Sequence, residues 1–460
     1  MLVCIYSVSL IIYVESAPDL GLRSAFSTSL KSPVSARVFQ PAIADGPLPQ
    51  SGDQVVELGD LKITTWPHLL SAPRFLRERI MGFASEPLPA DKFKRMPAAD
   101  GEQATWVYAK FHRDLEGASP QTIEGWCMLG TLPPEDILPT LLWFFVKLAL
   151  FVVGALVFWK RPTEATASQF FLLCIVTLGA YMGGYHWTHI ASQPPLVIGF
   201  MVCGVLLPVV SLHFYLIFPR PKQFLKERPG LTFALVYGPP TAFLLAILFL
   251  YARSRLLFQG QAAVEAVTSA LEDLRIVICV YLGVAAVWFL LSIAALIHSF
   301  RAVNDAMEHN QVKWILVGAC LALLPIGYSF YLAMWQPDEF GAGAAMWPMF
   351  AASVCLTAAF AVSITRYRLM ELDKLVSSGA SYFFVSFLAG VVHYAVALLI
   401  TLVFYQQLVG GPSFTETLTV GLTVLVLMLV LDLFRGKLRR ALDRRFSREK
   451  SQLEVTLQRM

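Results

Sequence analysis

Charged residues are scarce in this chain of 460 residues, where lysine, arginine, aspartate and glutamate together make up 15%. An ordinary soluble protein carries about 25% charged residues, whereas 56% of the residues here are hydrophobic. The formal net charge of +4 is too small to indicate a nucleic-acid partner. The composition therefore excludes an ordinary soluble protein and indicates one that is surrounded by lipid.

Cysteine pairs with metal-binding or redox spacing are also lacking. The seven cysteines are Cys4, Cys127, Cys174, Cys203, Cys279, Cys320 and Cys355. Neither a CxxC pair nor a Cys/His zinc spacing occurs among them. Only Cys127 lies outside the apolar runs, so it has no partner for a disulfide within its own domain. We predict neither a metal site nor a cofactor.

Catalytic signatures are missing as well. The chain has two asparagines, Asn304 and Asn310, and no histidine after His393, so it lacks the phosphoacceptor helix and the asparagine-rich ATP site of a histidine kinase. It contains no phosphate-binding loop and no HExxH motif. We therefore predict that no catalytic domain is encoded here.

Residues 16–135 differ from the rest because proline, glycine and charges interrupt short apolar runs. We predict strands at 34–40, 54–58, 104–111 and 122–130, a helix at 67–81 that is interrupted or restarted at Pro73, and a polar loop at 83–103. The preceding apolar stretch, 1–14, is short for a membrane span. We interpret 1–15 as an N-terminal membrane anchor, with a signal segment as the alternative, and 16–135 as a small α+β domain.

Long apolar runs fill the chain after Pro139. Each of them can cross the hydrocarbon layer, where a helix satisfies every backbone group. The predicted spans are 139–159, 168–188, 195–218, 231–251, 275–299, 312–334, 346–365, 380–405 and 416–434. The fold class is therefore mostly α, a polytopic bundle of nine helices at 136–434, or ten spans with the anchor.

Basic residues alternate between the predicted loops and indicate the orientation. One set of loops contains Lys160, Arg161, Arg220, Lys222, Lys226, Arg228, Arg301, Lys313, Arg366, Arg368 and Lys374. The other set contains only Arg253, Arg255 and Arg275. We expect a multi-pass protein of the inner (plasma) membrane, with 16–135 extracytoplasmic and the arginine-rich C-terminus cytoplasmic.

Residues 435–460 continue the last predicted span as a charged helix with apolar residues every three or four positions. Such a helix is typical of a signalling coil that pairs two copies of a chain. A basic amphipathic helix lying along anionic lipid is the alternative. We predict a homodimer formed through this helix.

The segment 41–63 has two turns that each place a glycine before an aspartate, Gly52-Asp53 and Gly59-Asp60. Glycine permits the positive φ of such turns, and aspartate can bond nearby backbone amides. Together with the predicted helix and later strands, this order resembles a PDZ domain over about 34–132. The resemblance implies a PDZ-like extracytoplasmic domain that adds a peptide strand to its sheet, with a docking or structural role as the alternative.

Three membrane segments extend the resemblance. They are SLHFYLIFPRP at 211–221, ITRYRLMELDKLVSSGASYFF at 364–384 and the basic segment after 435. Behind a PDZ-like domain they resemble the sensory and transmembrane module of bacterial sensor histidine kinases of the competence-pheromone receptor type. The resemblance implies a two-component signalling receptor whose output domain lies on another polypeptide or has been lost.

Four residues are candidate ligand contacts. His186 and His189 are spaced to share a helix face at the external end of a span, where interfacial packing is the alternative to a ligand site. His393 and Tyr394 fall near the middle of span 380–405, where a polar side chain needs a partner. We also expect no acidic or basic residue at the centre of any span.

We therefore expect the chain to be the transmembrane signal-sensing input module of a receptor, binding a peptide or small molecule and acting on a separate cytoplasmic output protein. A transporter or channel with an external accessory domain is the alternative, and it would need internal repeats or central charges. A membrane-embedded enzyme would need acid and base groups clustered at one interface.

Overall fold

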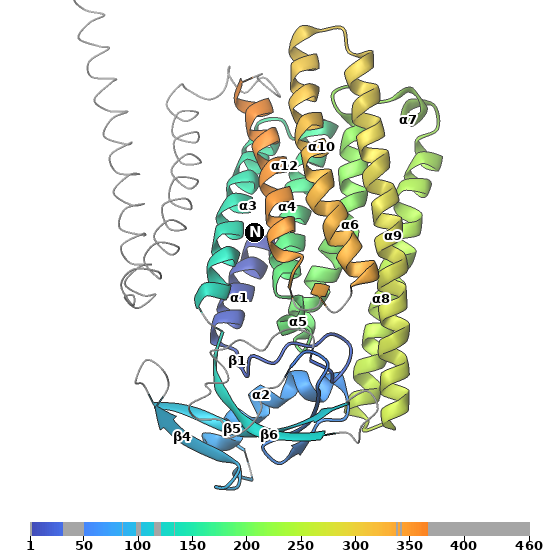
Figure 1. Ribbon diagram of the computed structural model, residues 1–460. Helices are drawn as coiled ribbons and strands as arrows, with labels where there is room; N and C mark the ends of the chain where they lie inside the picture. Colours follow the sequence, from blue (N-terminus) through green and yellow to red (C-terminus); the bar gives the residue numbers. More distant parts are fainter. Residues whose placement is uncertain are drawn as a thin grey trace, which may run out of the picture. The chain divides into compact units, whose positions relative to one another are not determined.

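The computed structural model describes residues 2–30, 50–84, 86–97, 103–114, 121–132, 134–336, 339–340 and 343–366. The chain divides into two compact units, Met1–Phe360 and Ala361–Met460. The first unit contains a small antiparallel sheet and a bundle of long apolar helices (Figure 1). The predicted strand 34–40, the predicted spans 380–405 and 416–434 and the helix at 435–460 all lie outside the described residues.

The sheet has the strand order β1-β6-β5-β2-β3, with β4 also paired to β5. Its strands are β1 (Pro18–Asp19), β2 (Gln54–Leu58), β3 (Leu61–Lys62), β4 (Phe93–Pro97), β5 (Gln103–Arg113) and β6 (Gln121–Thr131). Every pairing is antiparallel, and the longest one joins β5 to β6 from Thr105↔Leu129 to Arg113↔Gln121. Strand β2 is paired with β5 along one edge, and with the two residues of β3 at the end of its other edge.

One face of the sheet packs against helix α2 (Trp66–Ile80). Alternate residues of β5, including Val107 and Phe111, are fully buried, as a strand with one covered face requires. From α2, Leu69, Ala72 and Leu76 recur at helical spacing and complete the core. Helix α2 continues through Pro73, so the predicted interruption is wrong. Proline costs one backbone hydrogen bond there, and the buried apolar stripe on both sides keeps the helix intact.

The prediction of a polar loop over 83–103 is wrong at residues 93–97, because β4 pairs there from Phe93↔Val107 to Pro97↔Gln103. Lys94 and Arg95 made this segment look like a loop. Both side chains are exposed, and Lys94 Nζ lies 4.3 Å from the Trp126 ring centroid. Charged residues are tolerated in β4 because they face solvent.

The two predicted glycine turns both have left-handed backbone conformations. Gly52 has a φ of 99° and Gly59 a φ of 66°. A Cβ at Gly59 would lie 2.8 Å from Leu76 Cδ2, so this turn needs glycine for space as well as for conformation. The turn is therefore held close against α2.

Seven helices are long and apolar enough to cross a membrane within the part of the chain described. They are α3 (Pro134–Lys160), α4 (Ala165–Tyr185), α6 (Pro194–Ile217), α8 (Pro229–Gln259), α9 (Val264–Ala302), α10 (Ala306–Trp335) and α12 (Met346–Arg366). They coincide with the first seven predicted bundle spans, because so long an apolar run has few alternatives to a helix. Two short helices, α5 (Trp187–Ile190) and α7 (Gln223–Glu227), lie in the connections.

Helix α1 (Leu2–Ser16) has 15 residues and packs against α3, α4 and α6. The neighbouring helices approach α1 closely because they present small residues to it. The Tyr6 ring lies 2.8 Å from the position a Cβ would take on Gly199 in α6. The Tyr6 hydroxyl donates to the backbone oxygen of Leu196. Helix α1 is thus part of the bundle's packing.

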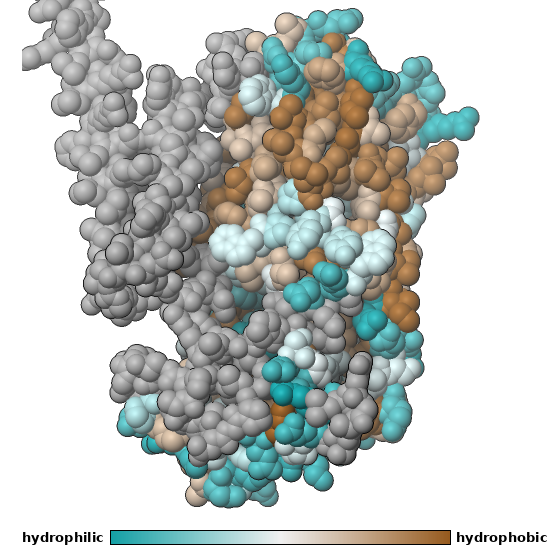
Figure 2. Space-filling model, in the orientation of Figure 1, coloured by the Kyte–Doolittle hydropathy of each residue, from teal (hydrophilic) through white to brown (hydrophobic). Residues whose placement is uncertain are grey.

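The surface agrees with a membrane setting. Figure 2 shows a hydrophobic band over the helices, with hydrophilic residues at the sheet domain and at the opposite helix ends. Near the domain-side ends of α10 and α12, the rings of Tyr331, Trp335 and Trp347 are exposed. Aromatic side chains at this level are typical of a membrane–water interface. We conclude that the chain is a membrane protein.

Candidate functional site

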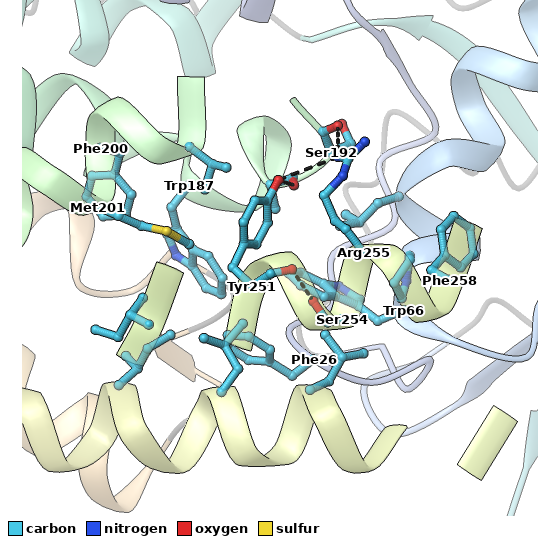
Figure 3. Close-up of a pocket in the computed structure, with 18 of the residues that line it drawn as sticks. Phe26, Trp66, Trp187, Ser192, Phe200, Met201, Tyr251, Ser254, Arg255 and Phe258 are labelled. Atoms are coloured by element: carbon cyan, nitrogen blue, oxygen red, sulfur yellow. Dashed lines mark hydrogen bonds between the residues drawn. The ribbon is translucent and has the colours of Figure 1, made fainter. Parts of the chain in front are cut away.

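A cavity of about 350 Å³ lies where the sheet domain meets the bundle. Its walls come from the start of α2, the α5 turn and the helices α6, α8 and α9. The residues labelled in Figure 3 are Phe26, Trp66, Trp187, Ser192, Phe200, Met201, Tyr251, Ser254, Arg255 and Phe258. This junction pocket is predominantly apolar with a few polar groups, as small-molecule sites usually are.

Three aromatic rings form the domain side of the junction pocket. The ring centroid of Phe26 lies 4.9 Å from that of Trp66 and 5.6 Å from that of Trp187. Trp66 Nε1 donates to the backbone oxygen of Ser24 at 3.1 Å. The rings therefore join the loop before β2, the first turn of α2 and the α5 turn.

Phe26 is held in an unusual backbone conformation, with a φ of 57°. For a bulky residue the left-handed region costs about 1–2 kcal/mol. Two hydrogen bonds fix this geometry, one within the loop from Ser24 Oγ to the backbone oxygen of Ser27 and one from Trp66 Nε1 of α2 to the backbone oxygen of Ser24. The loop thus presents the Phe26 ring to the pocket at a conformational cost.

The polar groups of the junction pocket come mainly from α8. Arg255 Nη1 donates to the backbone oxygen of Ser192 at 3.0 Å, and the Tyr251 hydroxyl donates to that of Ala191 at 3.2 Å. Ser192 Oγ also lies 3.4 Å from the Tyr13 hydroxyl. The α5–α6 turn is therefore tied to both α8 and α1, and Figure 3 shows Arg255 and Ser192 side by side.

The predicted ligand residues His186 and His189 lie at the same α5 turn but do not line the pocket. His186 is buried, with Nε2 2.6 Å from Thr140 Oγ1. His189 Nε2 lies 3.9 Å from Asp19 Oδ1, and Asp19 accepts two hydrogen bonds from Arg23, at 2.7 and 3.0 Å. Among the described residues, no group of three or more His, Cys, Asp or Glu side chains is placed to hold a metal ion.

These groups have perturbed pKa values. Burial, followed by the charge of Arg23, lowers the pKa of His189 to about 4 against the opposing effect of Asp19. Burial, then His189 and Arg23, holds the pKa of His186 well below its usual value. Burial alone would raise the pKa of Asp19, but Arg23, His189 and the Gly21 N–H lower it to about 2. At neutral pH the two histidines are therefore uncharged, and Asp19 is ionised.

The predicted turn residues Asp53 and Asp60 hold the sheet domain together. Asp53, 2% exposed, accepts from Arg113 Nε at 2.8 Å and Nη2 at 2.7 Å, and also from the Gln50 N–H. Asp60 accepts from Arg79 on α2, with Nη2 2.9 Å from Oδ2. Bidentate pairs of this kind fix geometry strongly. They lie apart from the junction pocket, and neither aspartate lines it.

Lys147 contradicts the expectation that no basic residue lies at the centre of a span. It lies midway along α3, is 2% exposed, and its Nζ donates to Thr357 Oγ1 of α12 at 3.2 Å. Nζ also lies 4.4 Å from the ring centroid of Tyr181. Among the described residues, no carboxylate lies within 4.0 Å of it. Averaging hydropathy over the run hid this single charge.

Two further polar atoms are buried near Lys147. Trp143 Nε1 and Ser353 Oγ have no hydrogen-bond partner among the described residues. Trp143 lies one turn before Lys147 on α3, and Ser353 lies one turn before Thr357 on α12. Unsatisfied buried polar atoms are rare, so this part of the bundle is a second candidate site. The predicted contacts His393 and Tyr394 lie outside the described residues.

Comparison of the chain with protein-family models, curated proteins and solved structures gives no match. The geometry of the junction pocket is therefore the basis on which a function is assigned.

Proposed function

We propose that this chain is the ligand-sensing input module of a membrane receptor. The observation that carries the proposal is the junction pocket, because its walls come from both the sheet domain and the bundle. A molecule bound there contacts Trp66 of the domain and Met201 and Tyr251 of the bundle at the same time. Binding would therefore change how tightly the domain packs against the helices.

The energy that such a receptor requires is modest. A ligand present at a hundred times its Kd stabilises the state that binds it by about 2.7 kcal/mol. That shift suffices to reverse the populations of two states of similar energy. Helix α8 begins at Pro229, at the end of the bundle away from the domain, and reaches the pocket with Tyr251 and Arg255. It is a continuous element through which a change at the pocket would reach the other end.

The charge distribution supports an orientation with the sheet domain outside the cell. The connections at the helix ends away from the domain contain Arg161, Arg220, Lys222, Lys226 and Arg228. The α8–α9 turn at 260–263, on the domain side, contains no charged residue. Basic residues favour the cytoplasmic side. We assign the protein to the inner (plasma) membrane with the domain extracytoplasmic.

The output is proposed from the sequence resemblance. The PDZ-like order of the domain and the segments resembling competence-pheromone receptors favour a two-component system in which this chain provides the input. We propose that residues 435–460 pair two copies of the chain and pass the signal to a separate cytoplasmic output protein. The described residues form a pocket of small-molecule size, so a small molecule is favoured over a peptide strand as the ligand.

A transporter is the second candidate, and Lys147 favours it. A buried charge at mid-membrane is expensive and usually belongs to a substrate or ion pathway. In a transporter, replacing Lys147 with methionine would abolish substrate-dependent uptake into proteoliposomes. In a receptor, the same change would leave binding in the junction pocket intact.

Hydrogen–deuterium exchange of the full chain in lipid nanodiscs tests the proposed function. A neutral apolar fluorophore, aminoanthracene, serves as the probe. We expect it to slow exchange in two places at once, Trp66–Ser71 of the domain and Val197–Val205 of α6. Protection on one side only would contradict a pocket that couples the two parts.

Matched tryptophan substitutions locate the effect. Gly204→Trp fills the pocket, since a Cβ at Gly204 meets only the Phe200 ring, at 3.6 Å or more. Gly327→Trp on α10 adds the same side chain at an exposed position with nothing within 4 Å of its Cβ. The first should abolish the protection and the second should preserve it. If both variants kept the protection, or both lost it, the probe would be bound outside the junction pocket.

A further inference from the structure

The junction pocket is elongated along the helix axes. On α8 it is lined from Ile247 to Gln259, and on α9 from Leu271 to Leu282. At about 1.5 Å of rise per residue, these two stretches are about 18 Å and about 16 Å long. The two helices are antiparallel neighbours, so Phe258 and Leu271 mark the end near the domain, and Ile247 and Leu282 mark the end within the bundle. A long, narrow ligand fits this shape better than a compact one.

The two ends differ in polarity. The inner end is apolar, with Met201, Val205 and Ile278, and the Tyr281 hydroxyl there is already bonded to the backbone oxygen of Val205 at 2.7 Å. The outer end adds Arg255, Ser192 and Ser254 to the aromatic rings of Phe26, Trp66 and Phe258. In Figure 3, Phe200 and Met201 lie at one side of the pocket, and Arg255 and Phe258 lie toward the other. This is the polarity of an amphiphile, with a headgroup outside and a chain inside.

Arg255 differs from the other arginines at this end of the hairpin of α8 and α9. Arg253 pairs with Asp273 at 3.4 Å, and Arg275 pairs with Glu272 at 3.7 Å. Arg255 bonds only to a backbone oxygen and a hydroxyl through Nη1. Among the described residues its Nε and Nη2 have no partner, although the side chain is half-buried. The arginine that lacks an acidic partner is the one that lines the pocket.

The position of Arg255 matches the level of a lipid headgroup. Its neighbour Arg253 pairs with Asp273, so this part of α8 lies beside the charged residues 272–275 of α9. After Arg275, α9 is apolar up to His298. A molecule with its charge at Arg255 and its chain directed toward Tyr281 would be oriented like a lipid of the outer leaflet.

The size of the cavity sets the length of the ligand. A cavity of about 150 Å³ binds benzene, which has six carbon atoms. By proportion, the 350 Å³ of this pocket hold about 14 non-hydrogen atoms. Dodecanoate, with a single chain and one carboxylate, is of this size.

We propose that the junction pocket binds a single-chain amphiphile with an anionic headgroup, with the headgroup paired to Arg255. This inference rests on the proposed function, because it names the ligand class of the same pocket. The guanidinium of Arg255 would give its free Nε–H and Nη2–H to two oxygens of one carboxylate or phosphate. The molecule would come from the bilayer or from outside the cell, and the headgroup chemistry is the same in both cases.

Displacement of the fluorescent fatty acid cis-parinarate from the full chain in zwitterionic nanodiscs tests this inference. We expect dodecanoate and dodecyl phosphate to displace the probe at least about tenfold more readily than dodecanol. In the Arg255→Gln variant, the concentration of either anion needed to displace the probe should rise about tenfold. Neither anion should then displace the probe more readily than dodecanol does. Arg255→Lys should retain part of the preference, because it keeps the charge.

Arg253→Gln is the matched control, since it removes the same charge two residues away on the exposed side of α8. It should leave displacement by dodecanoate unchanged. Equal displacement by dodecanol and dodecanoate in the unmodified chain would overturn the inference, as would equal losses in the two arginine variants. Either result would leave the proposed function standing if aminoanthracene still protects both walls of the pocket.

Two arms distinguish the sources of the ligand. Mass spectrometry of the chain extracted directly from membranes would find a bound fatty acid or lysolipid if the bilayer supplies it. Chain refolded without lipid and then given dodecanoate from solution would bind it if the external route is open. Failure of binding in both arms would overturn the inference, because the anionic ligand would have no access to Arg255.

Discussion

The cationic side chains of the sheet domain and those of the bundle differ in their partners. In the domain, Arg113 and Arg79 each form a bidentate pair with an aspartate. In the bundle and at its edge, Lys147 and Arg255 contact only hydroxyls, a ring or a backbone oxygen in the described structure. Removing one partner of a buried pair destabilises the fold because it leaves a buried charge unpaired, whereas a buried charge without a partner is already a cost to the fold. The difference separates structural charges from those available to a ligand.

The largest expected effect comes from breaking a pair in the domain. Asp53→Asn leaves Arg113 without its carboxylate in a site where Asp53 is 2% exposed. We expect the domain's free energy of unfolding to fall by about 3 kcal/mol, measured by pulse proteolysis in nanodiscs. Lys110→Gln, which removes an exposed pair with Glu124 at 3.5 Å, should cost under about 1 kcal/mol. Similar losses in both variants would show that the buried pair is not structural.

The second prediction concerns pH at the junction. Because burial and then Arg23 lower the pKa of His189 to about 4, the folded state binds fewer protons than the unfolded state between that value and about 6.5. The free energy of unfolding should therefore fall as the pH drops through this window, by about 3 kcal/mol. The groups that face His189 are His186, Asp19 and Arg23. The contribution of Asp19, whose pKa is lowered to about 2, should persist until the pH approaches that value.

Proteolysis of the junction at a series of pH values measures this effect. His189→Leu should reduce the change between pH 6.5 and 4, because the His186 imidazole is then the only one of the pair left to be protonated on opening. A variant with the unmodified pH profile would show that other groups cause it.

The third prediction concerns Lys147, the buried cation of the bundle. Lys147→Met removes a buried charge that has no carboxylate partner in the described structure and keeps a side chain of similar length. We expect the bundle's stability to stay the same or rise by about 1 kcal/mol, measured by unfolding in mixed detergent micelles. Thr357→Val, which removes the hydroxyl that contacts Lys147 at 3.2 Å, should cost about 1 kcal/mol. A loss for Lys147→Met as large as that for Asp53→Asn would remove the distinction between the two regions.

The smallest expected effects concern the two glycine turns. Gly59→Ala should destabilise the domain more than Gly52→Ala, although both residues have positive φ. Only at Gly59 does a Cβ meet a neighbour, Leu76 Cδ2 at 2.8 Å. We expect about 2 kcal/mol for the first and about 1 kcal/mol for the second. Thermal unfolding of the two variants side by side makes the measurement.

The elements with strong patterns could be predicted from the sequence. The first seven long apolar runs are helices in the structure, and β2 and the β5–β6 hairpin lie where short apolar runs indicated strands. Strand β4 was missed because Lys94, Arg95 and Pro97 look like a loop. Only its pairing with β5 makes it a strand. The predicted interruption of α2 at Pro73 is wrong because the packing of Leu69 and Leu76, which keeps the helix intact, cannot be read from the sequence.

The junction pocket could not be predicted, because its walls run from Phe26 to Leu282 and meet only in three dimensions. Arg255 was counted as one of the few basic residues on its side, and its isolation from acidic groups appears only when Asp273 and Glu272 are seen to pair elsewhere. The pair His186 and His189 was recognised, but its partners Thr140 and Asp19 are distant in the sequence. Lys147 is the single charged residue in the run 140–159, so its position at the centre of a span could be predicted from the sequence.

The most direct test of the receptor account is hydrogen–deuterium exchange at residues 219–228, at the end of the bundle away from the pocket. Dodecanoate is added to the full chain in nanodiscs, with Gly204→Trp as the blocked control. The account predicts a change of exchange in this connection for the unmodified chain and none for the blocked variant. Protection confined to the pocket, with no response at residues 219–228, would contradict a receptor and leave only a binding site.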